Sequence, residues 1–144
     1  MSGRRHAAGT AEMVAFVEAH FPEAGFGRGQ FVLEQLGPDH CRVRMPFDPA
    51  WVRPGPTVSG PAIMYLADIG AWIAVLAAAG LTPSAVTATL NITFLRGAGQ
   101  NDLLCDTRVL KAGKKLVSTA AEILRADTGE MVAHATTTYA LPRS

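Results

Sequence analysis

The sequence predicts an α+β fold in which a curved antiparallel sheet wraps around one long central helix. The apolar segment that follows Ser59 carries large side chains around its whole circumference, so a helix formed there has to be surrounded. Runs of strand-like sequence are separated by short turns rich in Gly, Asn and Asp, which favours antiparallel pairing. These runs are the only material in the chain that can surround the helix.

Length and composition indicate one globular domain. The chain has 144 residues, of which 49% are hydrophobic and 17% are charged. We find neither a repeat nor a linker, and we expect residues 1–9 to be a disordered N-terminus and residues 10–144 to form a single domain. The net charge of +1 and the absence of a basic stripe argue against a nucleic-acid partner.

The two cysteines, Cys41 and Cys105, each fall in a strand-like run and are expected to be buried as small apolar side chains. The N-terminal arginines are not followed by an uninterrupted apolar run, which argues against a secretory signal. Both features favour a reducing, cytoplasmic location. None of the four histidines is spaced with a cysteine or an acid as metal ligands are, so we expect no metal and no cofactor.

The first part of the chain predicts one short helix and two strands. Thr10 suits the N-cap of a helix that Pro22 stops, because apolar side chains recur at helical spacing between them. The segments 27–37 and 40–47 alternate as strands, with a turn between them. Residues 48–57 contain three prolines and are expected to form an irregular loop.

After the long helix the hydrophobic period changes from 3.6 to 2, which predicts strands. The first of these alternates between an apolar face and a face of threonines with Asn91; the apolar face is made by Val86, Ala88, Leu90, Ile92 and Phe94. Three further strands are predicted at 102–110, 115–126 and 131–141, joined by short turns.

The long apolar segment is also about long enough to span a bilayer. Asp68 near its middle opposes that alternative, because an acid there costs a few kcal/mol in lipid. In addition, the strands need an apolar partner, and this helix is the only sizeable one. We therefore expect no membrane partner.

The start of the long helix offers a site for an oxyanion. Pro61 suits the first helical position, which makes Gly60 the expected N-cap, with Ser59 just before it. The backbone N–H groups of Gly60 and Ala62 could then stabilise a developing negative charge. The alternative is that these small residues only begin a helix.

Asp68 is the second feature of this helix that indicates chemistry. A carboxylate in an apolar setting can act as a general base or a nucleophile, although it can equally be a structural acid with hydrogen-bonded partners. It lies about 12 Å along the axis from Gly60, so one carbonyl cannot reach both on the same helix. If the two cooperate, they come from two chains, and this predicts a dimer with two equivalent sites at its interface.

Several motifs of the chain resemble those of the hotdog-fold thioesterases, specifically the PaaI-like acyl-CoA thioesterases of the phenylacetate-pathway type. The resemblance covers roughly residues 28 to 141. It rests on RPGPTVSGP, on the helix half that ends in LAD, on TATLNITFLR, on LKAGKKL and on ADTGEMVAHATTTY.

This resemblance implies that Asp68 is the catalytic acid and that the Gly60 N–H of the other subunit polarises a thioester carbonyl. Thr87 falls where the family often has a Ser or Thr near the attacking water. The usual His-Gly-Gly of the turn reads Ser59-Gly60-Pro61 here, so Ser59 and Pro61 are the residues expected to flank the substrate.

The implied activity is hydrolysis of an acyl-CoA without a metal or a redox cofactor, by a homodimer or a dimer of dimers. Arg96 and Lys114 are candidate contacts for the CoA phosphates, with ordinary solvated turn charges as the alternative. Because the histidine is missing, a non-catalytic protein that binds acyl-CoA or an acyl group is the alternative function.

Overall fold

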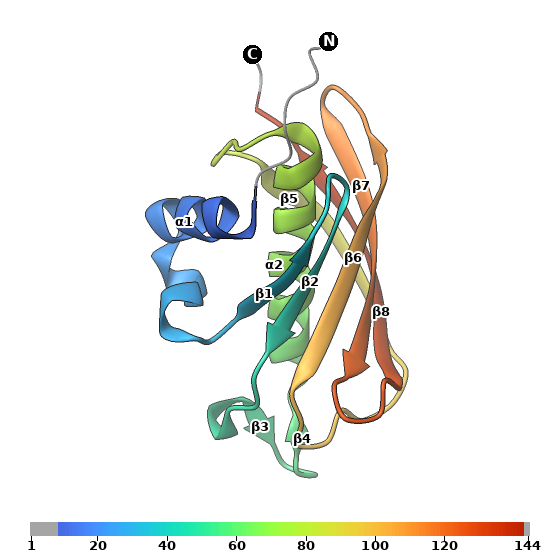
Figure 1. Cartoon of the computed structure of the whole chain (residues 1–144). Helices are drawn as coiled ribbons and strands as arrows, with labels where there is room; N and C mark the ends of the chain where they lie inside the picture. Colours follow the sequence, from blue (N-terminus) through green and yellow to red (C-terminus); the bar gives the residue numbers. More distant parts are fainter. Residues whose placement is uncertain (1–8, 143–144) are drawn as a thin grey trace.

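A computed structural model describes residues 9–142, and Figure 1 shows a six-stranded antiparallel sheet curved around the long helix α2. The strand order is β1-β2-β6-β7-β8-β5, and a separate two-stranded ribbon is formed by β3 and β4. The strands are β1 (Val32–Leu36), β2 (His40–Met45), β3 (Val52–Arg53), β4 (Thr57–Val58), β5 (Val86–Phe94), β6 (Leu103–Ala112), β7 (Leu116–Arg125) and β8 (Met131–Ala140). The α+β hotdog architecture predicted from the sequence is confirmed.

Helix α2 (Gly60–Ala79) fills the concave side of the sheet and is the centre of the core. It is long and apolar enough to span a membrane, with a mean hydropathy of 1.9, but 67% of that stretch is buried inside the fold. The sheet, and not lipid, supplies its apolar surroundings. This is the environment of the core helix of a soluble domain.

The side of α2 that faces β6 packs closely enough to require glycine. A Cβ at Gly70 would lie 2.9 Å from Cys105 Sγ and 3.0 Å from Thr107 Oγ1. The Cys41 thiol donates to the Gly70 carbonyl at 3.3 Å. Both cysteines are free and buried, as the sequence predicted, so their role in the fold is that of small core side chains.

The N-terminal region differs in detail from its prediction. Helix α1 (Thr10–His20) is present, but Gly9 and not Thr10 is its N-cap. Residues 22–24 and 26–28 form two 3-10 turns joined at Gly25, which adopts φ 83°, so the predicted strand at 27–37 begins only at Val32. The prediction of a disordered N-terminus falls almost entirely on residues outside the described range.

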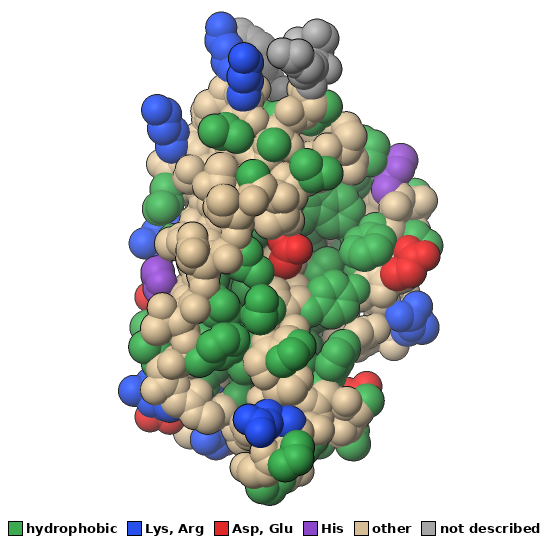
Figure 2. All heavy atoms as spheres, turned by 180° about the vertical axis from the view of Figure 1, so that it is seen from behind, with side chains coloured by type: hydrophobic (Ala, Val, Ile, Leu, Met, Phe, Trp, Pro, Cys, Tyr) green, Lys and Arg blue, Asp and Glu red, His purple; other side chains and the backbone are tan. Residues whose placement is uncertain are grey.

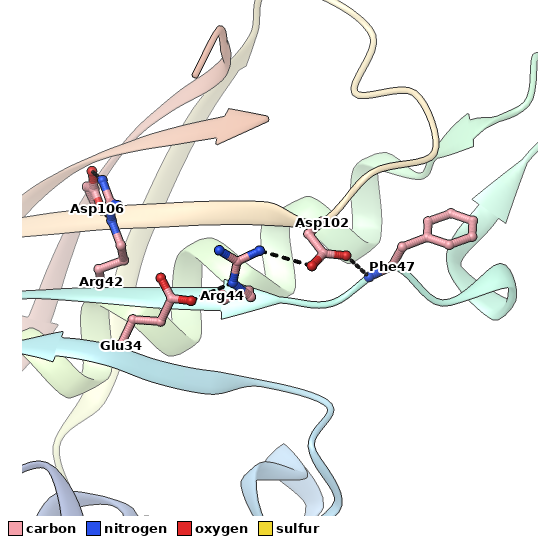
Figure 3. A network of polar contacts seen from close by, with 6 residues as sticks. All are labelled: Glu34, Arg42, Arg44, Phe47, Asp102 and Asp106. Carbon is pink, nitrogen blue, oxygen red and sulfur yellow. Dashed lines mark hydrogen bonds and ion pairs between the residues drawn. The ribbon is translucent and has the colours of Figure 1, made fainter. Parts of the chain in front are cut away.

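The segment between β2 and α2 is more ordered than the predicted irregular loop. It contains a 3-10 turn at Pro49–Trp51, which Asp48 caps, and the ribbon of β3 and β4. Asp102 fixes its start, because this carboxylate accepts from Phe47 N–H at 2.8 Å and from Arg44 Nη1 at 3.0 Å (Figure 3). Arg44 also pairs with Glu34, so β1, β2 and the residue just before β6 together hold the start of the segment that leads to α2.

Strand β5 forms one edge of the sheet and leaves apolar side chains uncovered. The exposed fraction is 57% for Val86 and 48% for Phe94, and it is 48% for Leu95, which directly follows the strand. The predicted alternation of this strand is interrupted, since the pairing with β8 shifts register between Thr87 and Thr89. Figure 2 shows the resulting surface, where hydrophobic side chains surround an acidic one in a hollow.

Candidate functional site

Asp68 lies on the open side of α2, partly exposed instead of buried in the apolar core. Two hydroxyl groups donate to the same carboxylate oxygen, Oδ1: Thr87 Oγ1 at 2.7 Å and Tyr139 Oη at 2.6 Å. Among the hydrogen bonds of residues 9–142, none reaches Oδ2. The arrangement therefore fixes the plane of the carboxylate and leaves one oxygen available to a reactant.

Thr87 and Tyr139 reach Asp68 because of the strand pairing. They are direct partners across β5 and β8, and both lie at the end of the sheet that passes the middle of α2. Burial raises the pKa of Tyr139 well above its ordinary value, and the negative charge of Asp68 raises it further. The phenol thus stays protonated and serves as a hydrogen-bond donor to the carboxylate.

A cavity of about 510 Å³ opens beside this carboxylate. Its polar end is formed by Asp68, Thr87 and Tyr139. Its other walls are mainly apolar and aromatic and are formed by His20, Phe21, Tyr65, Ile69, Trp72, Pro83, Ala85 and Val86. Such a cavity can hold an apolar group while presenting its attached polar group to Asp68.

Helices α1 and α2 build the aromatic wall together. The rings of Phe21 and Trp72 meet edge to face with their centroids 6.0 Å apart. Trp72 lies one turn beyond Asp68 on α2, so the cavity extends along this helix away from the carboxylate. In the sequence, the only signal for this wall is the helical spacing of Tyr65, Asp68 and Trp72.

The start of α2 corrects one expectation and sharpens another. Ser59 is the N-cap, and Gly60 is the first helical residue with Pro61 after it. The Ser59 hydroxyl accepts from Ala62 N–H at 3.3 Å, so the Ala62 donor is already used. Gly60 N–H has no acceptor among the hydrogen bonds of the described residues and is the donor left for a ligand.

Gly60 and Asp68 lie two helical turns apart on the same helix, as expected from their spacing. The structure therefore brings Asp68 and Thr87 together but leaves Gly60, Ser59 and Pro61 at a separate place. Gly60 is close to the exposed ring of Phe94, since a Cβ there would lie 3.5 Å from Phe94 Cζ. The helix start thus borders the uncovered apolar surface of β5.

The two candidate phosphate contacts lie in different settings. Arg96 donates to the carbonyl of Met131, the first residue of β8, and pairs at 3.5 Å with Glu130 in the turn before it, so Arg96 is held by neighbours at the start of β8. Lys114 is exposed at the tip of the β6–β7 hairpin. Neither lines the Asp68 cavity.

Sequence reasoning missed Tyr139, the second donor to Asp68. Its only signal was its position in the last predicted strand, in phase with the inward-facing Ala135 and Thr137. Without the pairing of β5 with β8, nothing placed it opposite Thr87.

Comparisons with known proteins agree with this fold. The family model of the thioesterase superfamily matches residues 55–132. A solved structure of a thioesterase candidate from Silicibacter sp. TM1040 is 30% identical and superposes with a TM-score of 0.86, covering 99% of this chain and 97% of that one. None of the curated proteins matches the chain.

Two further structures share the fold at lower identity. Thioesterase superfamily member 2 of zebrafish is 21% identical with a TM-score of 0.81, covering 94% of this chain and 100% of that one. The PaaI protein of the E. coli phenylacetic acid degradation operon is 19% identical with a TM-score of 0.75, covering 92% and 98%. The resemblance drawn from the sequence is confirmed, and the chain belongs to the thioesterase superfamily with a hotdog fold.

Proposed function

We propose that this protein is an acyl-CoA thioesterase that releases a free acid and CoA. The observation that carries the proposal is the Asp68 carboxylate, held at Oδ1 by Thr87 and Tyr139 at the polar end of a cavity with apolar walls. Membership of the thioesterase superfamily supports hydrolysis of a thioester as the reaction.

In this mechanism the acyl group occupies the aromatic cavity and its thioester carbonyl lies near Asp68. Asp68 Oδ2 takes a proton from a water molecule as that water attacks the carbonyl carbon. The tetrahedral intermediate collapses when the C–S bond breaks, and the sulfur leaves with its electron pair as the CoA thiolate. In the alternative mechanism, Asp68 attacks the carbonyl carbon itself, the C–S bond breaks to release the CoA thiolate, and water then hydrolyses the resulting mixed anhydride to the free acid and the Asp68 carboxylate.

The negative charge that develops on the carbonyl oxygen needs a donor, and we assign this role to Gly60 N–H of a second subunit. The helix start adds a partial positive charge at the same place. The edge strand β5 and its exposed apolar side chains supply a surface for a homodimer, and Gly60 borders this surface. A dimer of dimers is compatible with the same site.

We place the CoA outside the cavity, with Lys114 and Arg96, which lie at opposite ends of the sheet, as alternative contacts for its phosphates. Ser59 and Pro61 shape the turn next to the thioester. The reaction needs no cofactor in this scheme, and a cytoplasmic location would suit it.

A panel of acyl-CoA esters tests the activity. We expect the wild type to release CoA from at least one ester, and Asp68→Asn to lower kcat/KM by about a hundredfold or more. Asp39→Asn is the matched control, because Asp39 is an exposed acid in the β1–β2 turn. Unchanged turnover in Asp68→Asn would remove the central residue from the proposal.

Mixing two inactive variants tests the shared site. In a heterodimer of Asp68→Asn and Gly60→Pro, one of the two interface sites has both residues intact if each site uses two chains. Random mixing should then restore about a quarter of the wild-type activity. A site built from one chain would stay inactive in every mixture.

The alternative function is a non-catalytic acyl-CoA or acyl binding protein. It is favoured by the replacement of the usual histidine with Ser59, whose hydroxyl oxygen accepts from the backbone and caps α2. A protein of this kind would be stabilised against heat by acyl-CoA, with no release of CoA over the whole panel.

A further inference from the structure

The β6–β7 hairpin carries two large apolar side chains that the fold leaves uncovered. Leu110 is 55% exposed and Leu116 is 53% exposed. The pairing of the two strands shifts between Val109 and Lys111, so Leu110 is the extra residue of a bulge. Figure 1 shows that this hairpin reaches past the β1–β2 hairpin at one end of the molecule.

The tip of the same hairpin is basic. Arg108, Lys111, Lys114 and Lys115 are all exposed, and the sequence from 107 to 121 contains no acidic residue. In Figure 2 basic side chains gather at this end of the molecule, with hydrophobic ones beside them. Exposed leucines among lysines form an amphipathic tip.

An apolar row leads from this tip to the Asp68 cavity. Leu116 pairs with Ala140 across β7 and β8, and Ala140 pairs with Val86 across β8 and β5. Val86 is 57% exposed and also lines the cavity. The tip and the cavity wall are therefore joined by neighbouring positions of three strands.

We propose that this hairpin tip docks on an anionic lipid bilayer. Leucine side chains can enter the boundary between headgroups and acyl chains, while lysine stems extend alongside them and place their charges among the lipid phosphates. Each lysine near an anionic surface adds about 1 kcal/mol of attraction. A second copy of the same tip is a poor partner, because four positive charges would face four others.

This docking goes beyond the proposed thioesterase function and does not depend on it. The sequence argument against a membrane concerned a span made by α2, and contact at a membrane surface leaves α2 in the core. Docking would bring the outer end of this row, at Leu116, close to the lipid surface, where amphiphilic acyl compounds accumulate.

Sedimentation with lipid vesicles, without any substrate, tests the proposal. We expect the wild type to bind vesicles of phosphatidylcholine with about a third phosphatidylglycerol at about 0.02 M salt, and to bind pure phosphatidylcholine at least tenfold more weakly. Raising the salt to about 0.5 M should weaken binding by at least tenfold.

Two double variants assign binding to the tip. Leu110→Ser/Leu116→Ser and Lys111→Gln/Lys115→Gln should each weaken binding to the anionic vesicles by about tenfold or more. Lys114 is left in place because of its assignment to CoA. The matched controls are Val32→Ser, an exposed apolar side chain on the far edge of the sheet, and Arg28→Gln/Arg53→Gln, which removes two exposed charges elsewhere.

Three results would overturn the proposal. The first is no binding to anionic vesicles at low salt. The second is binding that both tip variants retain in full. The third is a protein that binds an acidic protein or free CoA but not vesicles, where this binding is lost in Lys111→Gln/Lys115→Gln. The exposed positions of these side chains keep the variants informative, since substitutions there leave the core intact.

Discussion

The two sides of helix α2 differ in almost every physical respect. The side that faces β2, β6 and β7 is closed, and at Gly70 it has no room for a single added methyl group. The other side carries Met64, which is 40% exposed, and Asp68, which lines the cavity described above. One continuous helix therefore provides both the centre of the core and the wall of the site.

This difference shows how the fold separates stability from chemistry. Among residues 9–142, the titratable groups that face α2 on the closed side are the thiols of Cys41 and Cys105, whose pKa values burial raises, that of Cys105 to about 12. The open side has few neighbours to stabilise it but exposes an ordered carboxylate. Substitutions on the two sides should consequently change different measurements.

The largest stability effect should come from the closed side. Leu66 is fully buried, and Leu66→Ala should lower the free energy of unfolding by about 2–5 kcal/mol because it leaves a cavity. Met64→Ala, two residues away on the open side, should change it by less than about 1 kcal/mol. Urea unfolding at low protein concentration measures both variants. Equal losses of unfolding free energy would show that the two sides of α2 do not differ in their contribution to stability.

Alkaline pH should also destabilise the closed side. The pKa values of Cys41 and Cys105 are higher in the folded state than in the unfolded chain, so their contribution is complete below about pH 8.5 and is lost as the pH rises above it. For two thiols the slope approaches about 2.7 kcal/mol per pH unit. In Cys41→Ala/Cys105→Ala, the unfolding free energy should fall less steeply between about pH 9 and 10.5 than in the wild type. An unchanged slope would show that groups other than these thiols cause the fall.

Adding one methyl group sharpens the comparison within α2. Gly70→Ala places a Cβ against Cys105 and Thr107, and we expect a loss of about 1–3 kcal/mol in unfolding free energy. Gly60→Ala is the control on the open side, where the added Cβ meets Phe94 at an ordinary contact distance. Thermal unfolding measures the stability of both variants. If Gly70→Ala were more stable than the wild type, β6 would have to shift enough to accommodate the added methyl group.

The smallest effects should come from the two donors on the open side. Tyr139→Phe removes one hydrogen bond to Asp68 and should lower kcat about tenfold with little change in KM, because a hydrogen bond to a charged group is lost. Thr87→Val should lower kcat by less, since Thr87 is exposed and water can replace it. Tyr65→Phe is the control, as its hydroxyl contacts the Glu23 carbonyl and not Asp68. A change in KM alone would indicate a role in binding.

The sequence predicted the closed side well and the open side in part. Apolar side chains all around one helix required a surrounding sheet, and this was correct. The N-caps of both helices were placed one residue too far along the chain, and the strand expected from residue 27 begins at Val32. These errors concern helix ends and turns, where hydrogen bonds among a few residues outweigh hydrophobic periodicity.

The sequence by itself determined that α2 is a core helix and that it carries one acid, Asp68, because hydrophobic period and residue type are local properties. Only the tertiary structure decided that β5 pairs with β8, that Tyr139 therefore meets Asp68 opposite Thr87, and that α1 supplies part of the cavity wall. Strand order and the docking of α1 join residues far apart in the chain, and no local pattern encodes such contacts.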